Sequence, residues 1–298
     1  MKWHFLFSNC AIRLNLVPFP PEDPGRADSY CFSRTGRLLL LLALVSVANI
    51  ASVGFAQEKL LLPPAEISAT FSIVAVDPES EIVGAAVASK YPAVGRVVPF
   101  VRAGVGGFCT QHFHVPQWGE TALDSLAFGE TPEQVIADLL KDDPQREQRQ
   151  LAIIDMAGRS ATHNPTAAPE GSHYWAAMSG RFYCCQGNTL NGREVITEMA
   201  RAYEDTVGNL SDKLMAALIA ADCAGGDHRG RLAAGIRVAK KEVDGFWLEL
   251  YIDRSDDAVI ELAKKYAELK HDAKGGWRGG RLPFEHPCTK RPNFIPPK

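Results

Sequence analysis

The stretch that decides the fold is Thr70-Phe71-Ser72-Ile73-Val74-Ala75-Val76-Asp77-Pro78, followed after a short gap by Ile82-Val83-Gly84-Ala85-Ala86-Val87-Ala88-Ser89-Lys90. Both runs consist largely of β-branched and small apolar residues, which predicts two buried strands. Turn-forming residues separate them, so we expect the strands to pair antiparallel. Thr70 would then lie at the same sheet edge as Lys90. A hydroxyl beside an ammonium group is a suitable place for nucleophilic chemistry.

The composition excludes several classes of protein. The chain has 298 residues, 46% of them hydrophobic, and a formal net charge of −3. A chain of this kind can bury a sizeable core, and its charge favours neither nucleic acid nor an acidic membrane surface as a partner. The cysteines that follow residue 56 show no CxxC spacing, which argues against a zinc site. We interpret them as packing residues, with room for one disulfide if the protein is exported. They are Cys109, Cys184, Cys185, Cys223 and Cys288.

The N-terminal part has the pattern of an export signal. Arg34 and Arg37 precede an apolar run at 38–53, and Gly54-Phe55-Ala56 places small residues before a cut. The alternative is an uncleaved membrane anchor, although the run is shorter than the roughly 20 residues that a spanning helix needs. We therefore predict a periplasmic or extracellular protein. Its predicted parts are an extension with a signal peptide at 1–56, a linker or propeptide at 57–69, one domain at 70–271, and a Gly/Pro-rich tail at 272–298.

The remaining elements favour an α+β fold, because strands and helices come in separate groups without a βαβ rhythm. We expect antiparallel sheets flanked by helices. A Thr131–Gln134 capping box and a Ser211 N-cap mark two helix starts. Further strands are predicted at 97–101, 105–110, 150–155, 181–185, 232–239 and 245–252, and helices at 119–128, 135–140, 192–203, 211–222 and 255–269.

Several motifs, in order along the domain, resemble those of the DUF1028 family, a family of unknown function. They are Thr-Phe-Ser-Ile-Val-Ala-x-Asp-Pro at 70–78, Ala-Val-Ala-Ser-Lys-x-x-Ala-Val-Gly at 86–95, Gly-Val-Gly-x-x-x-Thr-Gln at 104–111, Arg-Gln at 149–150, Gln-Gly-Asn-x-Leu at 186–190 and Gly-Gly-Asp-x-Arg-Gly at 225–230. Proteins of this family resemble N-terminal-nucleophile hydrolases. The resemblance therefore implies a four-layer αββα sandwich of two antiparallel sheets.

The resemblance also implies a mechanism. In N-terminal-nucleophile hydrolases, the first residue of the mature chain attacks an amide carbonyl through its hydroxyl, and its free α-amine takes the proton. Thr70 matches that residue, but it is internal here. The mechanism therefore requires a cut between Ala69 and Thr70. The alternative is that Thr70 only starts a strand, which its β-propensity favours.

The other candidate residues are polar groups that the same resemblance or the strand pattern places near Thr70. Lys90, after Ser89, would tune the pKa of the amine or the hydroxyl, unless it is a solvated strand end. Ser72 shares a face with Thr70 and would orient the amine, unless it faces a helix. Amide and backbone groups at strand ends suit an oxyanion or a substrate, although they are also ordinary turn residues. These are Ser89, Thr110, Gln111, Gln186, Gly187 and Asn188, with the Ser89 and Thr110 hydroxyls among them.

Asp227 and Arg229 would either bind substrate or pair with each other and fix their loop. His112-Phe113-His114, with His163 or His173, is a weak metal-like signal. Cys184 and Cys185 lack an adjacent base for thiol chemistry, and in a strand their side chains would point to opposite faces. Two segments depart from the family pattern, His163-Asn164-Pro165 and Leu232-Ala233, and they bear on substrate specificity.

The resemblance, together with the export signal, thus implies an exported amidohydrolase that cleaves a small amide or a short peptide. It needs no metal or organic cofactor, binds no nucleic acid and has no stable membrane span after cleavage; a homo-oligomer stays open. One alternative is a non-catalytic protein that binds a peptide or metabolite on the same sandwich. Another is a metal-dependent hydrolase built around His112 and His114.

Overall fold

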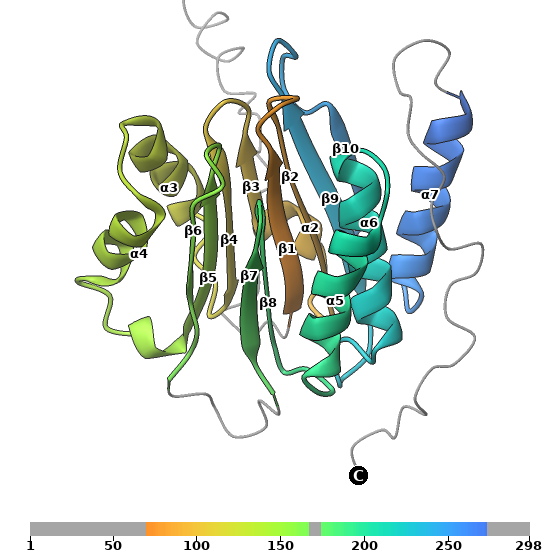
Figure 1. Cartoon of the computed structure of the whole chain (residues 1–298). Helices are drawn as coiled ribbons and strands as arrows, with labels where there is room; N and C mark the ends of the chain where they lie inside the picture. The colour runs from red at the N-terminus through yellow and green to blue at the C-terminus, as the bar shows by residue number, and fades with distance from the viewer. Residues whose placement is uncertain (1–69, 167–173, 273–298) are drawn as a thin grey trace, which may run out of the picture. The chain divides into compact units, whose positions relative to one another are not determined.

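A computed structural model describes residues 70–166 and 174–272 (Figure 1). The predicted extension, signal peptide, linker and tail lie outside these residues, apart from the first residue of the tail, and so does His173. Within the two described ranges, no helix has both the length and the apolar character needed to cross a bilayer.

The larger sheet has six antiparallel strands, in the order β10-β9-β2-β1-β8-β7. The two strands of the opening stretch, β1 and β2, therefore lie in its middle, as their unbroken apolar sequences predict. The strand bounds are β1 Thr70–Asp77, β2 Ile82–Ser89, β7 Ala176–Gly180, β8 Tyr183–Asn188, β9 Ala233–Lys240 and β10 Leu248–Ile252.

The smaller sheet has four antiparallel strands in the order β3-β4-β5-β6. Its outer face carries α3 and α4, which lie to the left in Figure 1. The bounds are β3 Pro99–Arg102, β4 Gly106–His112, β5 Arg149–Asp155, β6 Ser160–His163, α3 Trp118–Ala127 and α4 Pro132–Leu140, with a short 3₁₀ turn at Arg146–Gln148 before β5.

Three helices, α5, α6 and α7, cover the outer face of the six-stranded sheet (Figure 1). The order of layers is therefore helices, sheet, sheet, helices, which confirms the prediction of an α+β sandwich. The bounds are α5 Glu194–Asp205, α6 Leu210–Cys223 and α7 Ala258–Asp272; a short helix, α2 Val94–Val97, leads into β3.

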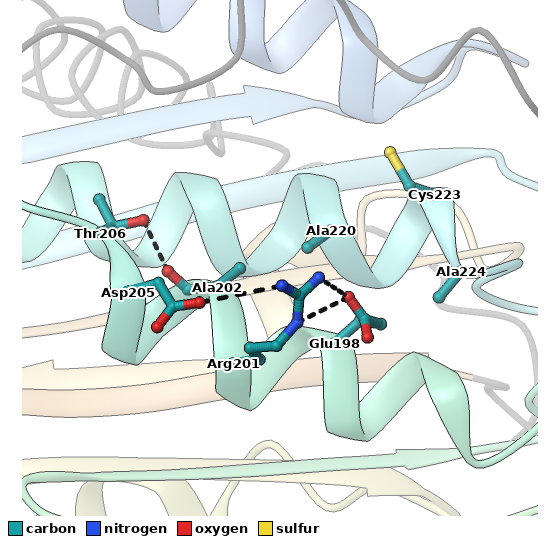
Figure 2. A pocket seen from close by; sticks show the side chains of 8 residues that line it. All are labelled: Glu198, Arg201, Ala202, Asp205, Thr206, Ala220, Cys223 and Ala224. Atoms are coloured by element: carbon teal, nitrogen blue, oxygen red, sulfur yellow. Dashed lines mark hydrogen bonds and ion pairs between the residues drawn. The ribbon is translucent and has the colours of Figure 1, made fainter.

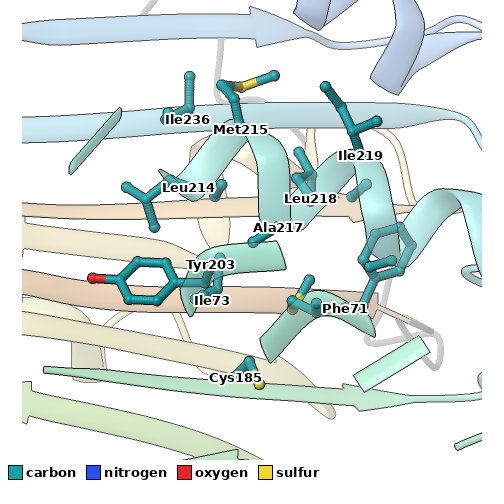
Figure 3. Close-up of a cluster of buried hydrophobic side chains, with 14 of the residues drawn as sticks. Phe71, Ile73, Cys185, Tyr203, Leu214, Met215, Ala217, Leu218, Ile219 and Ile236 are labelled. Atoms are coloured by element: carbon teal, nitrogen blue, oxygen red, sulfur yellow. The ribbon is translucent and has the colours of Figure 1, made fainter. Parts of the chain in front are cut away.

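Three apolar clusters hold the layers together. The largest packs α5, α6 and α7 on the six-stranded sheet, and Figure 3 shows Leu214 and Leu218 of α6 among side chains of β1 and β9. A second lies between the sheets and includes Val74 of β1 and Ile154 of β5. The third packs α3 and α4 on the outer face of the smaller sheet. Because β1 contributes alternate residues to the first two clusters, it is buried on both faces.

The register places the candidate residues at one end of the layer between the sheets. Thr70 pairs with Ser89 of β2 on one side and with Asn188 of β8 on the other. Side chains that are directly opposite in an antiparallel pair share a face, so these three point the same way. Two residues on, Ser72 lies on that face too, and Val74 after it packs between the sheets. The predicted common face of Thr70 and Ser72 is confirmed.

Several predicted bounds are wrong. Gln186-Gly187-Asn188 continues strand β8 instead of breaking it, and the strand expected at 97–101 begins only at Pro99, after α2. The cap of α6 is Asn209 and not Ser211: Asn209 has an extended backbone, and its side chain accepts a hydrogen bond from the Asp212 amide. Strands β6 and β7 were not predicted, because neither shows an alternating apolar pattern.

Candidate active site

Thr70 is fully buried at the start of β1, in the layer between the two sheets. Its hydroxyl Oγ1 lies 3.3 Å from the hydroxyl Oγ of Ser89, and the two form a hydrogen bond. Ser89 Oγ also accepts a hydrogen bond of 2.9 Å from the backbone amide of Tyr91. This amide fixes the Ser89 oxygen, which in turn fixes the Thr70 hydroxyl.

Gln111, at the end of β4, connects the opposite sheet to the start of β1. Its Oε1 accepts a 2.7 Å hydrogen bond from Ser72 Oγ, and its Nε2 donates to the Thr70 carbonyl at 3.1 Å. The same Nε2 donates to Gln150 Oε1 at 2.7 Å. An amide nitrogen carries two hydrogens. Both donors of Gln111 are therefore engaged within the protein, which favours a role in holding Thr70 over a direct contact with an oxyanion.

Gln150, the second residue of β5, is the centre of this polar network, although it is not among the site residues predicted from the sequence. Its Oε1 accepts from Gln111 and, at 2.9 Å, from Asn188 Nδ2. Its Nε2 donates to Asn164 Oδ1 at 2.8 Å and to the Gly187 carbonyl at 2.9 Å. The signal that points to it is an amide side chain at the start of an otherwise apolar strand, in the matched Arg-Gln pair.

The remaining predicted amide and hydroxyl residues surround the network. Asn188 Oδ1 accepts from Thr189 Oγ1 at 3.1 Å, so its orientation is fixed from both sides. Gln186 Nε2 donates to the Cys109 carbonyl across the sheets, and its Oε1 has no hydrogen-bond partner among the described residues. Thr110 Oγ1 accepts from the Val115 amide and thereby shapes the loop after β4.

Lys90 occupies a different position from its neighbour Ser89. Its ammonium Nζ donates to the Arg231 carbonyl at 3.1 Å and lies 3.7 Å from an Asp256 carboxylate oxygen. Its side chain is about one third exposed (38%). Of the two residues, Ser89 contributes the contact to the Thr70 hydroxyl, and Lys90 brings a positive charge to the same end of the sheet.

Asp227 and Arg229 pair with each other and fix the loop that follows α6. Arg229 donates to Asp227 through its backbone amide, Nε and Nη2, at 2.9 to 3.2 Å. Asp227 also accepts from the Lys90 backbone amide at 2.9 Å. Burial raises the pKa of the Asp227 carboxyl, and the hydrogen bond and charge of Arg229 oppose that shift. These contacts join the loop to the end of β2.

His112 and His114 follow Gln111 at the end of β4. His112 is fully buried with a φ of 64°, a left-handed conformation that is unusual for histidine, and its Nδ1 lies 2.7 Å from the Gln148 carbonyl. Because a carbonyl only accepts, Nδ1 carries the proton. Burial lowers the pKa of both histidines, and the charge of Arg149 lowers it further. In the part of the chain that the structure describes, no three potential metal ligands cluster.

The buried cysteines are thiols without an activating environment. Cys109, Cys184 and Cys185 are free, and burial raises the pKa of each, to about 12 for Cys109 and Cys185. Cys184 packs between the sheets, whereas Cys185 packs under the helices, which confirms the prediction of opposite faces. None of the three is a candidate nucleophile.

Fold and site together define a helix-flanked, two-sheet α+β protein whose central strand begins with a buried threonine inside an amide network. The family model described as "Family of unknown function (DUF1028)" matches residues 70–262, and the chain belongs to this family. The crystal structure of protein SPO2555 from Silicibacter pomeroyi, also described as DUF1028, is similar: identity is 29%, the TM-score is 0.62, and the match covers 68% of this chain and 87% of that one. A comparison with curated proteins finds no match.

Proposed function

We propose that this chain is the precursor of an exported N-terminal-nucleophile amidohydrolase, and that Thr70 becomes its first residue and its nucleophile. The observation that carries the proposal is the position of Thr70. It is the first residue of the central strand, its hydroxyl is hydrogen-bonded to Ser89, and its carbonyl is held by Gln111. A hydroxyl and a backbone nitrogen of one residue are thus fixed in a rigid strand between two sheets, as catalysis requires.

The cut that exposes Thr70 is part of the proposal. The Thr70 hydroxyl attacks the Ala69 carbonyl and forms an ester as the peptide nitrogen takes up a proton, and water then hydrolyses the ester. The freed α-amine has an ordinary pKa of about 7.7–8.0, so part of it is neutral at physiological pH. In each turnover the amine takes the hydroxyl proton during attack and passes it to the departing amine of the substrate. Water releases the acyl group.

The other residues have supporting roles in this proposal. Ser89 orients the hydroxyl, Lys90 supplies positive charge at the same sheet end, and Gln111 and Gln150 hold the carbonyl of Thr70 and the side chain of Asn188. Asn188 and the adjacent backbone are the proposed contacts for the oxyanion or the substrate amide. The substrate is a small amide or a short peptide.

Two measurements test the proposal. Intact-mass and N-terminal sequencing of the purified protein should find a chain that begins at Thr70. In a screen of amide substrates, Thr70→Ala should have no activity above background, and Thr70→Ser should retain part of it because it keeps a hydroxyl. Thr197→Ala, on α5, is the control. Activity that persists in Thr70→Ala, or in a chain that still carries Ala69, would exclude this nucleophile.

The role of Lys90 needs its own comparison. Lys90→Arg keeps the positive charge and Lys90→Met removes it, while both keep much of the aliphatic stem. We expect Lys90→Met to shift the pH–activity profile upward, because a lost positive charge raises the pKa of a nearby amine. Equal profiles in the two variants would leave Lys90 a surface residue paired with Asp256.

A non-catalytic binding protein is the second candidate. It is favoured by the complete burial of Thr70 and by the internal use of both Gln111 donors. In that case the polar network is a structural core, and Thr70→Ala would alter stability or ligand affinity without abolishing any turnover.

A further inference from the structure

Cys223, the last residue of α6, differs from the other described cysteines. Cys109, Cys184 and Cys185 lie in strands as buried free thiols, whereas Cys223 is half-buried and disulfide-bonded. Its partner is therefore Cys10, Cys31 or Cys288, the cysteines outside the described ranges. Cys10 and Cys31 precede the predicted signal-peptide cut. In an exported, processed chain, Cys288 is the partner that remains.

Cys223 also lines a cavity of about 410 Å³ between α5 and α6. Figure 2 shows Ala220 of α6, Ala224 just after it and Ala202 of α5 as small apolar side chains there, with Cys223 at one end. Arg201 is ion-paired with Glu198 and lies 3.9 Å from Asp205 at the α5 side. We call this cavity, with the eight residues labelled in Figure 2, the α5–α6 groove. Its three alanines offer apolar contacts to a segment of chain that binds there.

The charges of the groove and of the C-terminal segment are complementary. The residues that line the groove carry a net charge of −1, from Glu198, Asp205 and Arg201, and helix α5 as a whole carries −3, from four acidic residues and one arginine. Residues 273–298 carry six lysines and arginines and one glutamate, a net charge of +5. The same segment has five prolines and two phenylalanines within ten residues of Cys288 on either side. Prolines favour extended chain and phenylalanines supply apolar contacts.

The segment is long enough to reach the groove. Tyr266 of α7 donates a 2.8 Å hydrogen bond to Asp212, so the second half of α7 lies beside the first turn of α6. From Asp212 to Cys223, α6 rises about 16 Å. Cys288 is the sixteenth residue after Asp272, and a chain of that length spans up to about 50 Å when extended.

We propose that residues 273–298 dock in the α5–α6 groove and that a Cys223–Cys288 disulfide fixes them there. Two thiols lose two protons and two electrons in this step, and a disulfide-bearing oxidant of the export compartment takes them up and becomes a dithiol. The proposal depends on the predicted export and is independent of the amidase. Its experiment measures thiols. The disulfide proposal can therefore fail while the amidase proposal holds, and the amidase proposal can fail while the disulfide is present.

The bond is tested on protein expressed for export, with the mature N-terminus verified by mass. A non-reducing peptide map should contain a linked pair that holds Cys223 and Cys288. Thiol titration after denaturation should find three free thiols, those of Cys109, Cys184 and Cys185, and four in Cys288→Ser, because Cys223 is released. A chain with five free thiols, or a link from Cys223 to Cys109, Cys184 or Cys185, would overturn the proposal.

Docking is tested by the rate of ring closure. In the reduced protein, glutathione disulfide should reoxidise the pair quickly, because docking raises the effective concentration of the two thiols. Reversing two groove charges with Glu198→Lys and Asp205→Lys should slow closure several-fold at low salt, with the difference shrinking at high salt. Glu133→Lys with Asp138→Lys, at two exposed acidic residues of α4, makes the same change in net charge away from the groove and is the control. Equal rates in all three proteins would refute docking.

Discussion

At the scale of single residues, Gln150 uses all of its hydrogen-bonding capacity inside the protein. Its oxygen accepts twice and its nitrogen donates twice, and the partners belong to both sheets. A buried amide with every group satisfied rigidifies its surroundings, whereas an unsatisfied one is costly. Gln150 therefore sets the distance between Gln111 and Asn188.

We predict that Gln150→Leu destabilises the protein by about 2–4 kcal/mol, because it leaves the Gln111 and Asn188 amides and the Gly187 carbonyl without their partner. Urea unfolding, followed by circular dichroism, measures the change. Gln117→Leu, an exposed glutamine before α3, should stay within about 0.5 kcal/mol of wild type. Equal midpoints for the two variants would mean that water replaces Gln150 without cost.

His112 predicts a loss of stability in mild acid. Burial lowers the pKa of His112 in the folded protein, and the charges of Arg229 and Arg149 act in the same direction. In the unfolded chain its pKa is near 6.5. The unfolded state therefore binds more protons below about pH 6.5, and stability falls as the pH drops.

Thermal unfolding of wild type and His112→Asn between pH 8 and pH 5 measures this effect. Asparagine tolerates the left-handed backbone at this position, so the variant isolates the imidazole. We expect a smaller loss of stability with falling pH in His112→Asn, with His114 accounting for a residual slope. An unchanged slope would mean that His112 does not take part.

The sequence predicted where the candidate residues lie on their strands, but it did not predict Gln150, the centre of the polar network. Strand periodicity was enough to place Thr70 and Ser72 on one face and to bring the end of β2 beside Thr70. The contact itself comes from Ser89 and not from the more conspicuous Lys90, because the exact register decides which side chain lies opposite. Gln150 was missed because its role depends on which strands of the second sheet face β1 and β8, and this long-range packing has no local sequence signal.

At the scale of elements, two helix N-caps contribute measurably to the stability of the protein. Thr131 caps α4 and Asn209 caps α6, each in a reciprocal capping box. Asn209→Ala should destabilise the protein by about 1 kcal/mol, whereas Asn209→Asp should be nearly neutral because it keeps the accepting oxygen. Thr131→Ala tests the corresponding cap of α4, in the other helical layer. No difference between Asn209→Ala and Asn209→Asp would contradict the cap assignment.

The spacing between the two sheets depends on Gly107 of β4. A Cβ atom at this position would collide with Val74 of β1 and come within 3.2 Å of Val83. Gly107→Ala should therefore cost about 1–3 kcal/mol through overpacking. At Gly192, a Cβ would approach only the flexible end of Glu194, so Gly192→Ala should be tolerated. Unfolding curves of the two variants distinguish these outcomes.

The elements that the sequence predicted well are those with strong local patterns. The capping box before α4 and the apolar runs of β1, β2 and β5 were placed within one or two residues. Strand β7, Ala176–Gly180, has a half-exposed edge position and no alternation, so pairing with β8 alone makes it a strand. The Ser211 cap was wrong because Asn209, two residues earlier, offers an equal side chain with the required extended backbone.

At the scale of the whole molecule, the layer between the sheets is polar at one end and apolar along the rest. Hydrogen bonds at the Thr70 end cross between the sheets, and valine, alanine and isoleucine side chains fill most of the remainder. The apolar part supplies adhesion and the polar part supplies a fixed geometry. A substitution that weakens the packing of the apolar part should therefore also change the hydrogen-bonded geometry around Thr70.

Strand β1 is a central strand of the six-stranded sheet and pairs with β2 on one side and with β8 on the other. If the proposed cut at Thr70 is self-made, only an assembled molecule can perform it, since a loose chain does not hold the hydroxyl against the carbonyl that it must attack. Maturation would then depend on correct folding, because a chain that fails to fold never acquires the reactive amine. The ratio of uncut to cut protein in Gly107→Ala, read by intact mass, should rise in step with its lost stability. A constant ratio would assign the cut to an outside protease.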